Sequence, residues 1–170
     1  MQVTGYTLRE AIRRQQLRRD TVAAQFSDTL HVFEGEEKQS PDEIAAALMK
    51  AEKAVAALQA AQDEYNLRVK VEGKNVEKMT LCTAVKLVGG TGRLEKLWRT
   101  AAAPKQDRYD LGRDLVRNKD EVRARSAMST RDLTDRATKA AGYAGALRAA
   151  IAEANGTKID IEGLDGGLFE

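Results

Sequence analysis

The sequence contains few cysteine, proline and aromatic residues. Cys82 is the only cysteine among 170 residues, which makes an intrachain disulfide impossible and favours a reducing compartment, the cytoplasm. There are two prolines, and aromatic residues make up 5% of the chain. Few prolines leave long helices uninterrupted, and few aromatics leave little bulk to fill a core. The composition therefore predicts slender helices around a thin core.

Long apolar runs and a strong charge excess are also missing. No stretch approaches the roughly 18 apolar residues of a membrane span, and residues 1–6 lack the basic start and apolar core of a signal peptide. The 28 basic residues nearly balance the 26 acidic ones, for a net charge of +2. The net charge of the chain therefore does not favour nucleic-acid binding. We expect no membrane partner.

The chain does contain clear helix starts with apolar repeats behind them. Ser40-Pro41-Asp42-Glu43 combines a hydroxyl cap, proline at the first helical position and a glutamate three residues after the serine. Ser129-Thr130-Arg131-Asp132 opens a second such helix. Behind them, apolar residues recur in steps of four and three: Ile44, Leu48, Ala51, Val55, Leu58 and Tyr65, then Leu133, Ala137, Ala140, Ala144, Leu147 and Ile151. This seven-residue repeat predicts helices that bury against other helices.

Four helices follow from these signals. A capping box at Thr7 predicts the first, and Asn155-Gly156 predicts a left-handed stop for the last. Their expected ranges are 7–29, 41–67, 81–103 and 130–154. Residues 67–76 alternate and predict a short hairpin or an extended loop, and residues 158–161 predict a small edge strand. We expect loop over 105–128, with an extended piece over 122–128.

These elements predict an all-α fold of antiparallel helical hairpins or a four-helix bundle, with long coiled-coil-like helices and short extended connections. Residues 1–156 would form a single helical domain. Residues 157–170 would form a flexible acidic tail, since it carries Asp160, Glu162, Asp165 and Glu170. Both apolar seams are rich in alanine, which buries little surface. We therefore expect partner subunits to complete the burial.

Three features invite a chemical interpretation, and a structural one is favoured for each. Gly89-Gly90-Thr91-Gly92 lacks the lysine of a phosphate loop and the strand before it, so it favours a kink or a break in a helix. His31 with Glu34, Glu36 and Glu37 fits no metal-ligand spacing. Cys82 has no histidine near it in sequence and favours a small core residue. We expect no catalytic residue, no cofactor, no metal and no enzyme activity.

Two segments are candidate contact sites. Lys105, Asp107, Arg108 and Tyr109 mix both charges with an aromatic ring, which suits a carboxylate or anion contact or a tether between a loop and a helix end. The first helix carries arginines at i, i+4 spacing, which we interpret as a basic face able to meet phosphates: Arg9, Arg13, Arg14 and Arg18.

Four short segments resemble the septicolysin-like family of small, largely uncharacterised bacterial helical proteins, across most of residues 6–155. Their residues are Tyr6-Thr-Leu-Arg-Glu-Ala-Ile12, Val32-Phe-Glu-Gly-Glu-Glu37 with Ser40-Pro-Asp-Glu43, Lys105-Gln-Asp-Arg-Tyr109, and Ile151-Ala-Glu-Ala-Asn155. The resemblance implies a helical fold more than a function, because none of these motifs is catalytic. The family name implies a pore-forming toxin, although the residues show no amphipathic strand pair of barrel type.

The sequence therefore leaves three candidate functions. The favoured one is a non-enzymatic, cytoplasmic structural or interaction protein that assembles with itself and could bind another protein. The second is a nucleic-acid-binding module that uses the basic face and the later basic residues Arg113, Arg117, Arg123 and Arg125. The membrane-active toxin is the least favoured.

Overall fold

The computed structural model describes residues 1–31, 39–103 and 127–170. This part of the chain is mostly helical, with small antiparallel sheets, so the expected all-α class is right at the coarse level. The helices are α1 (Gly5–Thr29), α2 (Pro41–Arg68), α3 (Leu81–Ala102) and α4 (Thr130–Asn155).

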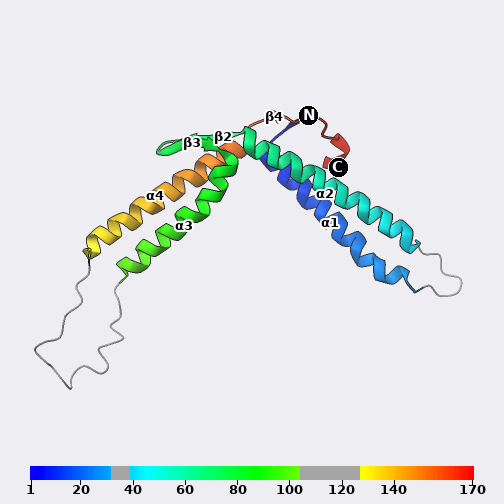
Figure 1. Ribbon diagram of the computed structural model, residues 1–170, viewed down its shortest axis with the longest axis horizontal. Coiled ribbons are helices and arrows are strands. Elements are labelled where there is room, and N and C mark those ends of the chain that lie inside the picture. The colour runs from blue at the N-terminus through cyan, green and yellow to red at the C-terminus, as the bar shows by residue number, and fades with distance from the viewer. Residues whose placement is uncertain (32–38, 104–126) are drawn as a thin grey trace, which may run out of the picture.

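The helices pair as two antiparallel hairpins that diverge from one junction. α1 packs on α2 and α3 packs on α4, whereas contacts between the pairs are sparse. In Figure 1 the hairpins form an open V, with α1 and α3 on its concave side and both chain termini at the junction. The expected antiparallel hairpins are therefore confirmed, but a four-helix bundle is not. The apolar repeats pack within their own hairpin, so the two hairpins do not pack against each other along their length.

Small sheets hold the junction. β2 (Lys70–Gly73) and β3 (Val76–Thr80) form a hairpin between α2 and α3, where Asn75 takes a left-handed turn conformation with φ of 65°. This confirms the hairpin expected from the alternation in residues 67–76. β1 (Gln2–Val3) pairs antiparallel with β4 (Ile159–Asp160), which confirms the short strand expected near the end of the chain.

The core lies at the junction, and each helix contributes to it. Its fully buried side chains come from all four helices and from β2: Leu8, Leu58, Tyr65, Val71, Leu81 and Leu147. Packing becomes thinner away from the junction. In the second hairpin, no described residue from 92 to 103 or from 127 to 143 is buried. The second hairpin therefore depends on the junction for most of its apolar burial, whereas the first also buries Ile44, Ala51 and Val55 along α2.

Tyr65 of α2 connects the end of α4 with the start of α1 at the junction. Its hydroxyl donates to the carbonyl oxygens of Ala154 and Thr157, each 2.8 Å away, and its ring lies beside Gly5. Burial raises the pKa of the Tyr65 phenol. Gly5 has to be glycine here, since a Cβ at this position would overlap Asn155 Oδ1 and lie 2.9 Å from Tyr65 Cε1.

Two helix ends differ from the expectation. α1 begins one turn early because Thr4 is the cap and Thr7 completes the capping box from the third helical position. Gly156 is not a left-handed stop: its φ is −83° and its N–H bonds to the carbonyl oxygen of Glu153, 2.9 Å away. Asn155 remains helical and buried, where its Nδ2 donates to the Ile151 carbonyl oxygen at 2.7 Å. The start of α1 is thus set by a local capping box that lies three residues before the expected one, and α4 ends where it was expected with only the conformation of Gly156 different.

The C-terminal segment is packed, which corrects the expectation of a flexible tail. Ile161 is buried, and Leu164, Leu168 and Phe169 pack on the core. The short 3-10 helix η2 (Gly166–Phe169) lies against α1, where buried Gln15 donates to the Leu168 carbonyl oxygen at 3.0 Å. The four acidic side chains of this segment stay exposed while its apolar ones turn inward.

Candidate functional site

Helix α3 carries two apolar stripes, and α4 covers one of them. The covered stripe contains Ala84, Val88, Thr91 and Trp98, which are buried or half-buried. The second repeats with the same seven-residue period but is exposed: Leu87, Leu94 and Leu97 have exposed fractions of 37%, 47% and 68%. At about 100° per residue, it lies roughly 100° around the helix from the covered stripe. We call these three leucines the α3 stripe.

The free edge of the α3 stripe is basic. Lys86 and Arg93 are exposed and project on the side of the stripe away from α4, by the same helical period. The nearest acid on α3, Glu95, lies on the α4 side and accepts from Arg99 at 2.7 Å. The stripe is thus an apolar ridge with a positive border, and it extends over about 15 Å of helix.

The first hairpin carries an apolar groove of about 380 Å³. Its lining comes from both helices: Phe26, Ala45, Leu48, Met49 and Glu52. Met49 is 59% exposed and Phe26 is 38% exposed, so their side chains leave this surface open to solvent. We call these residues the α1/α2 groove.

Carboxylates border this groove. Arg19 bonds Asp20 at 2.8 Å and lies 3.8 Å from Glu52, on the other helix. The hydrogen bond with Asp20 and the charge of that carboxylate raise the pKa of the Arg19 guanidinium. Two carboxylates against one guanidinium leave the border with an excess of negative charge.

A polar hollow of about 630 Å³ lies at the start of α4. It is bordered by acids and bases together: Asp132, Asp135, Arg136 and Lys139. Arg136 is stacked over the Trp98 ring at 5.1 Å, and Asp132 caps the helix with Ser129. These side chains have structural roles in the second hairpin, and their opposite charges give the hollow no preference for an anion or a cation.

The predicted basic face on the first helix is split. Arg9, Arg13, Arg14 and Arg18 are all exposed on α1. At about 100° per residue, however, the Arg9/Arg13 pair and the Arg14/Arg18 pair lie roughly 140° apart around the helix. Arg14 also lies 4.0 Å from Glu10. The helix thus presents two narrow basic edges where a single face was expected, because i, i+4 spacing aligns residues within each pair only.

The other candidate residues predicted from the sequence do not form a site in the part of the chain that the structure describes. Lys105, Asp107, Arg108 and Tyr109 lie outside these residues, as do Glu34, Glu36, Glu37 and the later arginines. Cys82 is half-buried, and α3 continues as one helix through Gly89–Gly92, without the break considered above. In residues 1–31, 39–103 and 127–170, no three metal-ligating side chains gather. In the same ranges, no helix is apolar over a bilayer-spanning length.

Sequence reasoning missed both the α3 stripe and the α1/α2 groove. The leucine repeat was readable, but a helix with two stripes requires the structure to show which one α4 covers. The groove combines side chains from helices joined through residues 30–40, so no local pattern could reveal it.

Comparison with known proteins does not identify a family for this chain. The chain matches no protein-family profile, no curated protein and no solved structure. The resemblance to the septicolysin-like family therefore stays a prediction.

Proposed function

We propose that this chain is a non-enzymatic structural or interaction protein that assembles with copies of itself. The observation that supports this most directly is the α3 stripe, because three leucines at coiled-coil spacing are exposed on a helix whose other stripe is covered. Exposed apolar surface of this kind marks association sites on soluble proteins. The lone cysteine agrees with a cytoplasmic setting, as the sequence analysis proposed.

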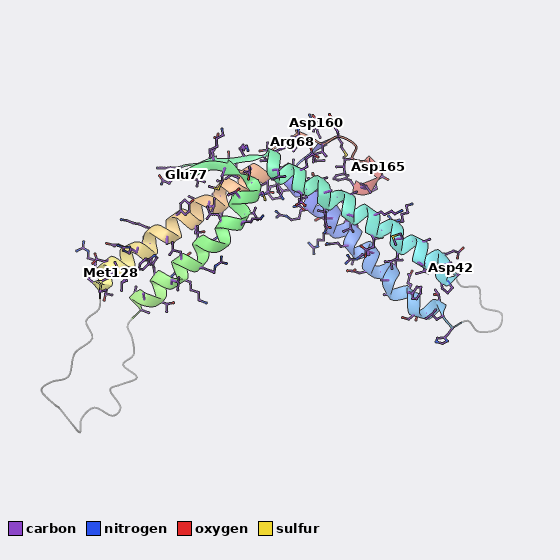
Figure 2. The ribbon with its side chains drawn as sticks, viewed as in Figure 1. Asp42, Arg68, Glu77, Met128, Asp160 and Asp165 are labelled. Carbon is purple, nitrogen blue, oxygen red and sulfur yellow. The ribbon has the colours of Figure 1, made fainter. Side chains whose placement is uncertain are left out.

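The shape of the chain supports the same proposal. The junction joins the two hairpins at an open angle (Figure 1), and each hairpin carries exposed apolar side chains. Figure 2 places Asp42 and Met128 at the far ends of the hairpins, with Arg68 and Asp160 at the junction. Arg68 secures that junction by donating to the Asp160 carbonyl oxygen at 2.7 Å. A rigid junction with two extended hairpins suits a building element of a larger assembly.

Light scattering across a concentration series tests the proposal. We expect a mass that is a multiple of the 18.7 kDa chain at micromolar concentration. Leu94→Asp with Leu97→Asp should lower that mass towards a single chain. Val85→Asp is the matched control, because Val85 is similarly exposed but lies on the opposite side of α3. A wild-type protein that stays monomeric throughout the series overturns the proposal.

A nucleic-acid-binding module is the second candidate, and the exposure of Arg9, Arg13, Arg14 and Arg18 is the observation in its favour. It predicts salt-sensitive binding that weakens in Arg13→Gln with Arg14→Gln. The split of these arginines into two edges places this candidate second. Liposome leakage is the corresponding test of the toxin implied by the family resemblance, and we expect none.

A further inference from the structure

We infer that the α3 stripe of one copy docks into the α1/α2 groove of a second copy, in a head-to-tail contact. This inference rests on the proposed self-assembly and specifies which surfaces meet. Each copy would offer one ridge and one groove and so make two contacts.

The shapes of the two surfaces correspond. The α3 stripe is a ridge of leucines along about 15 Å of one helix. The groove extends along α2 from Ala45 to Glu52, about 10 Å, with Phe26 of α1 as its other wall. Ridges of side chains that enter grooves are the general way in which helices pack on one another. Burial of the three leucines would also cover Phe26 and Met49.

The charges of the two surfaces decide between this arrangement and a symmetric one. In the head-to-tail contact, Lys86 and Arg93 at the border of the ridge meet the carboxylates of Asp20 and Glu52. If two α3 stripes packed on each other, the same basic residues would face their own copies. Like charges across an interface disfavour it, whereas opposite charges select register and partner.

The consequence is an assembly with direction. A contact between two different surfaces closes into a ring if the rotation between copies allows it, and otherwise continues as a filament. A dimer through two paired α3 stripes would saturate after two copies. The head-to-tail contact stops at two copies only if the rotation between them is 180°, so that each ridge enters the other copy's groove, and otherwise gives masses beyond two chains.

A charge exchange on the full chain tests which surfaces meet. The first variant is Lys86→Glu with Arg93→Glu, which gives the ridge a negative border. The second is Glu52→Lys, which gives the groove a positive one. Each variant alone places like charges at the contact, and we expect its dissociation constant to rise by roughly tenfold or more. In an equimolar mixture, each ridge meets a complementary groove, so assembly should return with strictly alternating copies.

Controls separate this result from general charge effects. Lys74→Glu with Lys96→Glu changes the charge of exposed residues away from the stripe, and Glu77→Lys does the same for an exposed acid on β3. Both should assemble as the wild type does. Circular dichroism of every variant should show unchanged helix content, since the altered residues are exposed.

The outcomes distinguish the two proposals. A wild-type protein that never exceeds 18.7 kDa defeats self-assembly altogether. A wild-type assembly that both charge variants retain, or that the mixture fails to restore, overturns the head-to-tail contact while self-assembly stands. A mass fixed at two chains that Glu52→Lys leaves unchanged also overturns it and points to a dimer through paired α3 stripes.

Discussion

The junction and the outer parts of the hairpins are made from the same four helices, but their packing differs. At the junction, leucine and tyrosine side chains from every helix are fully buried, and backbone carbonyls receive hydrogen bonds from distant side chains. Along the outer second hairpin, no described residue from 92 to 103 or from 127 to 143 is buried, and side chains such as Trp98, Leu133 and Ala137 are only half-buried. The comparison separates two roles: the junction holds the fold, and the outer helices leave apolar surface available for assembly. Each prediction below contrasts a junction residue with a residue of the hairpins.

The largest expected effect is the loss of a junction leucine. Leu147→Ala removes a fully buried side chain where α4 meets the core, so we expect the free energy of unfolding to fall by about 2–5 kcal/mol. Leu97→Ala truncates a leucine that is 68% exposed and should change it by less than about 0.5 kcal/mol. Urea titration at a low, fixed protein concentration measures both. Equal losses would contradict the division between junction and hairpins.

Replacement of a glycine by alanine should change the stability of the protein in opposite directions in the two regions. Gly5→Ala forces a Cβ against Asn155 and Tyr65, and we expect it to destabilise the protein by about 1–3 kcal/mol. Gly89→Ala adds a Cβ at ordinary van der Waals distance from Arg93, in the middle of α3. Because alanine favours helix over glycine, this change should stabilise the protein by about 0.5–1 kcal/mol. Thermal unfolding followed by circular dichroism gives both signs.

The Tyr65 hydroxyl should give a smaller and pH-dependent effect. Tyr65→Phe removes the donor to the Ala154 and Thr157 carbonyls and should cost about 1–2 kcal/mol at neutral pH. Burial raises the pKa of this phenol in the folded state. The folded state therefore holds the proton more tightly than the unfolded chain does, so the stabilisation is complete below pH 10 and is lost as the pH rises through the raised value.

Denaturant titrations of the wild type and Tyr65→Phe from pH 7 to pH 11 check this sign. The difference in unfolding free energy between them should shrink above pH 10. Leu97→Ala in the second hairpin changes no titratable group and is the control, so its difference from the wild type should show no such trend. A gap that widens in alkali would contradict the hydrogen-bonding role of the Tyr65 hydroxyl.

The smallest effect concerns the packed C-terminal segment. Gln15→Ala removes the bond to the Leu168 carbonyl oxygen, and we expect a loss of about 0.5–1.5 kcal/mol together with earlier proteolysis near residue 168. Gln25→Ala changes an exposed glutamine in the outer part of α1 and should alter neither property. If Gln15→Ala left the segment as resistant as the wild type, apolar packing alone would account for its docking.

The sequence by itself determined the helices, because their signals are local. Ser40 with Glu43 and Ser129 start helices where their side chains bond to free backbone N–H groups, and the structure confirms both. The seven-residue repeats correctly predicted antiparallel partners. The same local signals placed the cap of α1 three residues too late and predicted a left-handed Gly156, which is not left-handed, although α4 ends where it was expected.

Only the tertiary structure decided which residues of the hairpins meet and which of their surfaces are covered. It placed Tyr65 between Gly5 and Thr157, docked the C-terminal segment on α1, and divided the basic residues of α1 into two edges. It also determined which stripe of α3 is covered and joined Phe26 to Met49 in one groove. Burial depends on which helix faces pair, and a periodic sequence with two usable stripes on one helix leaves that choice to the packing of the whole chain.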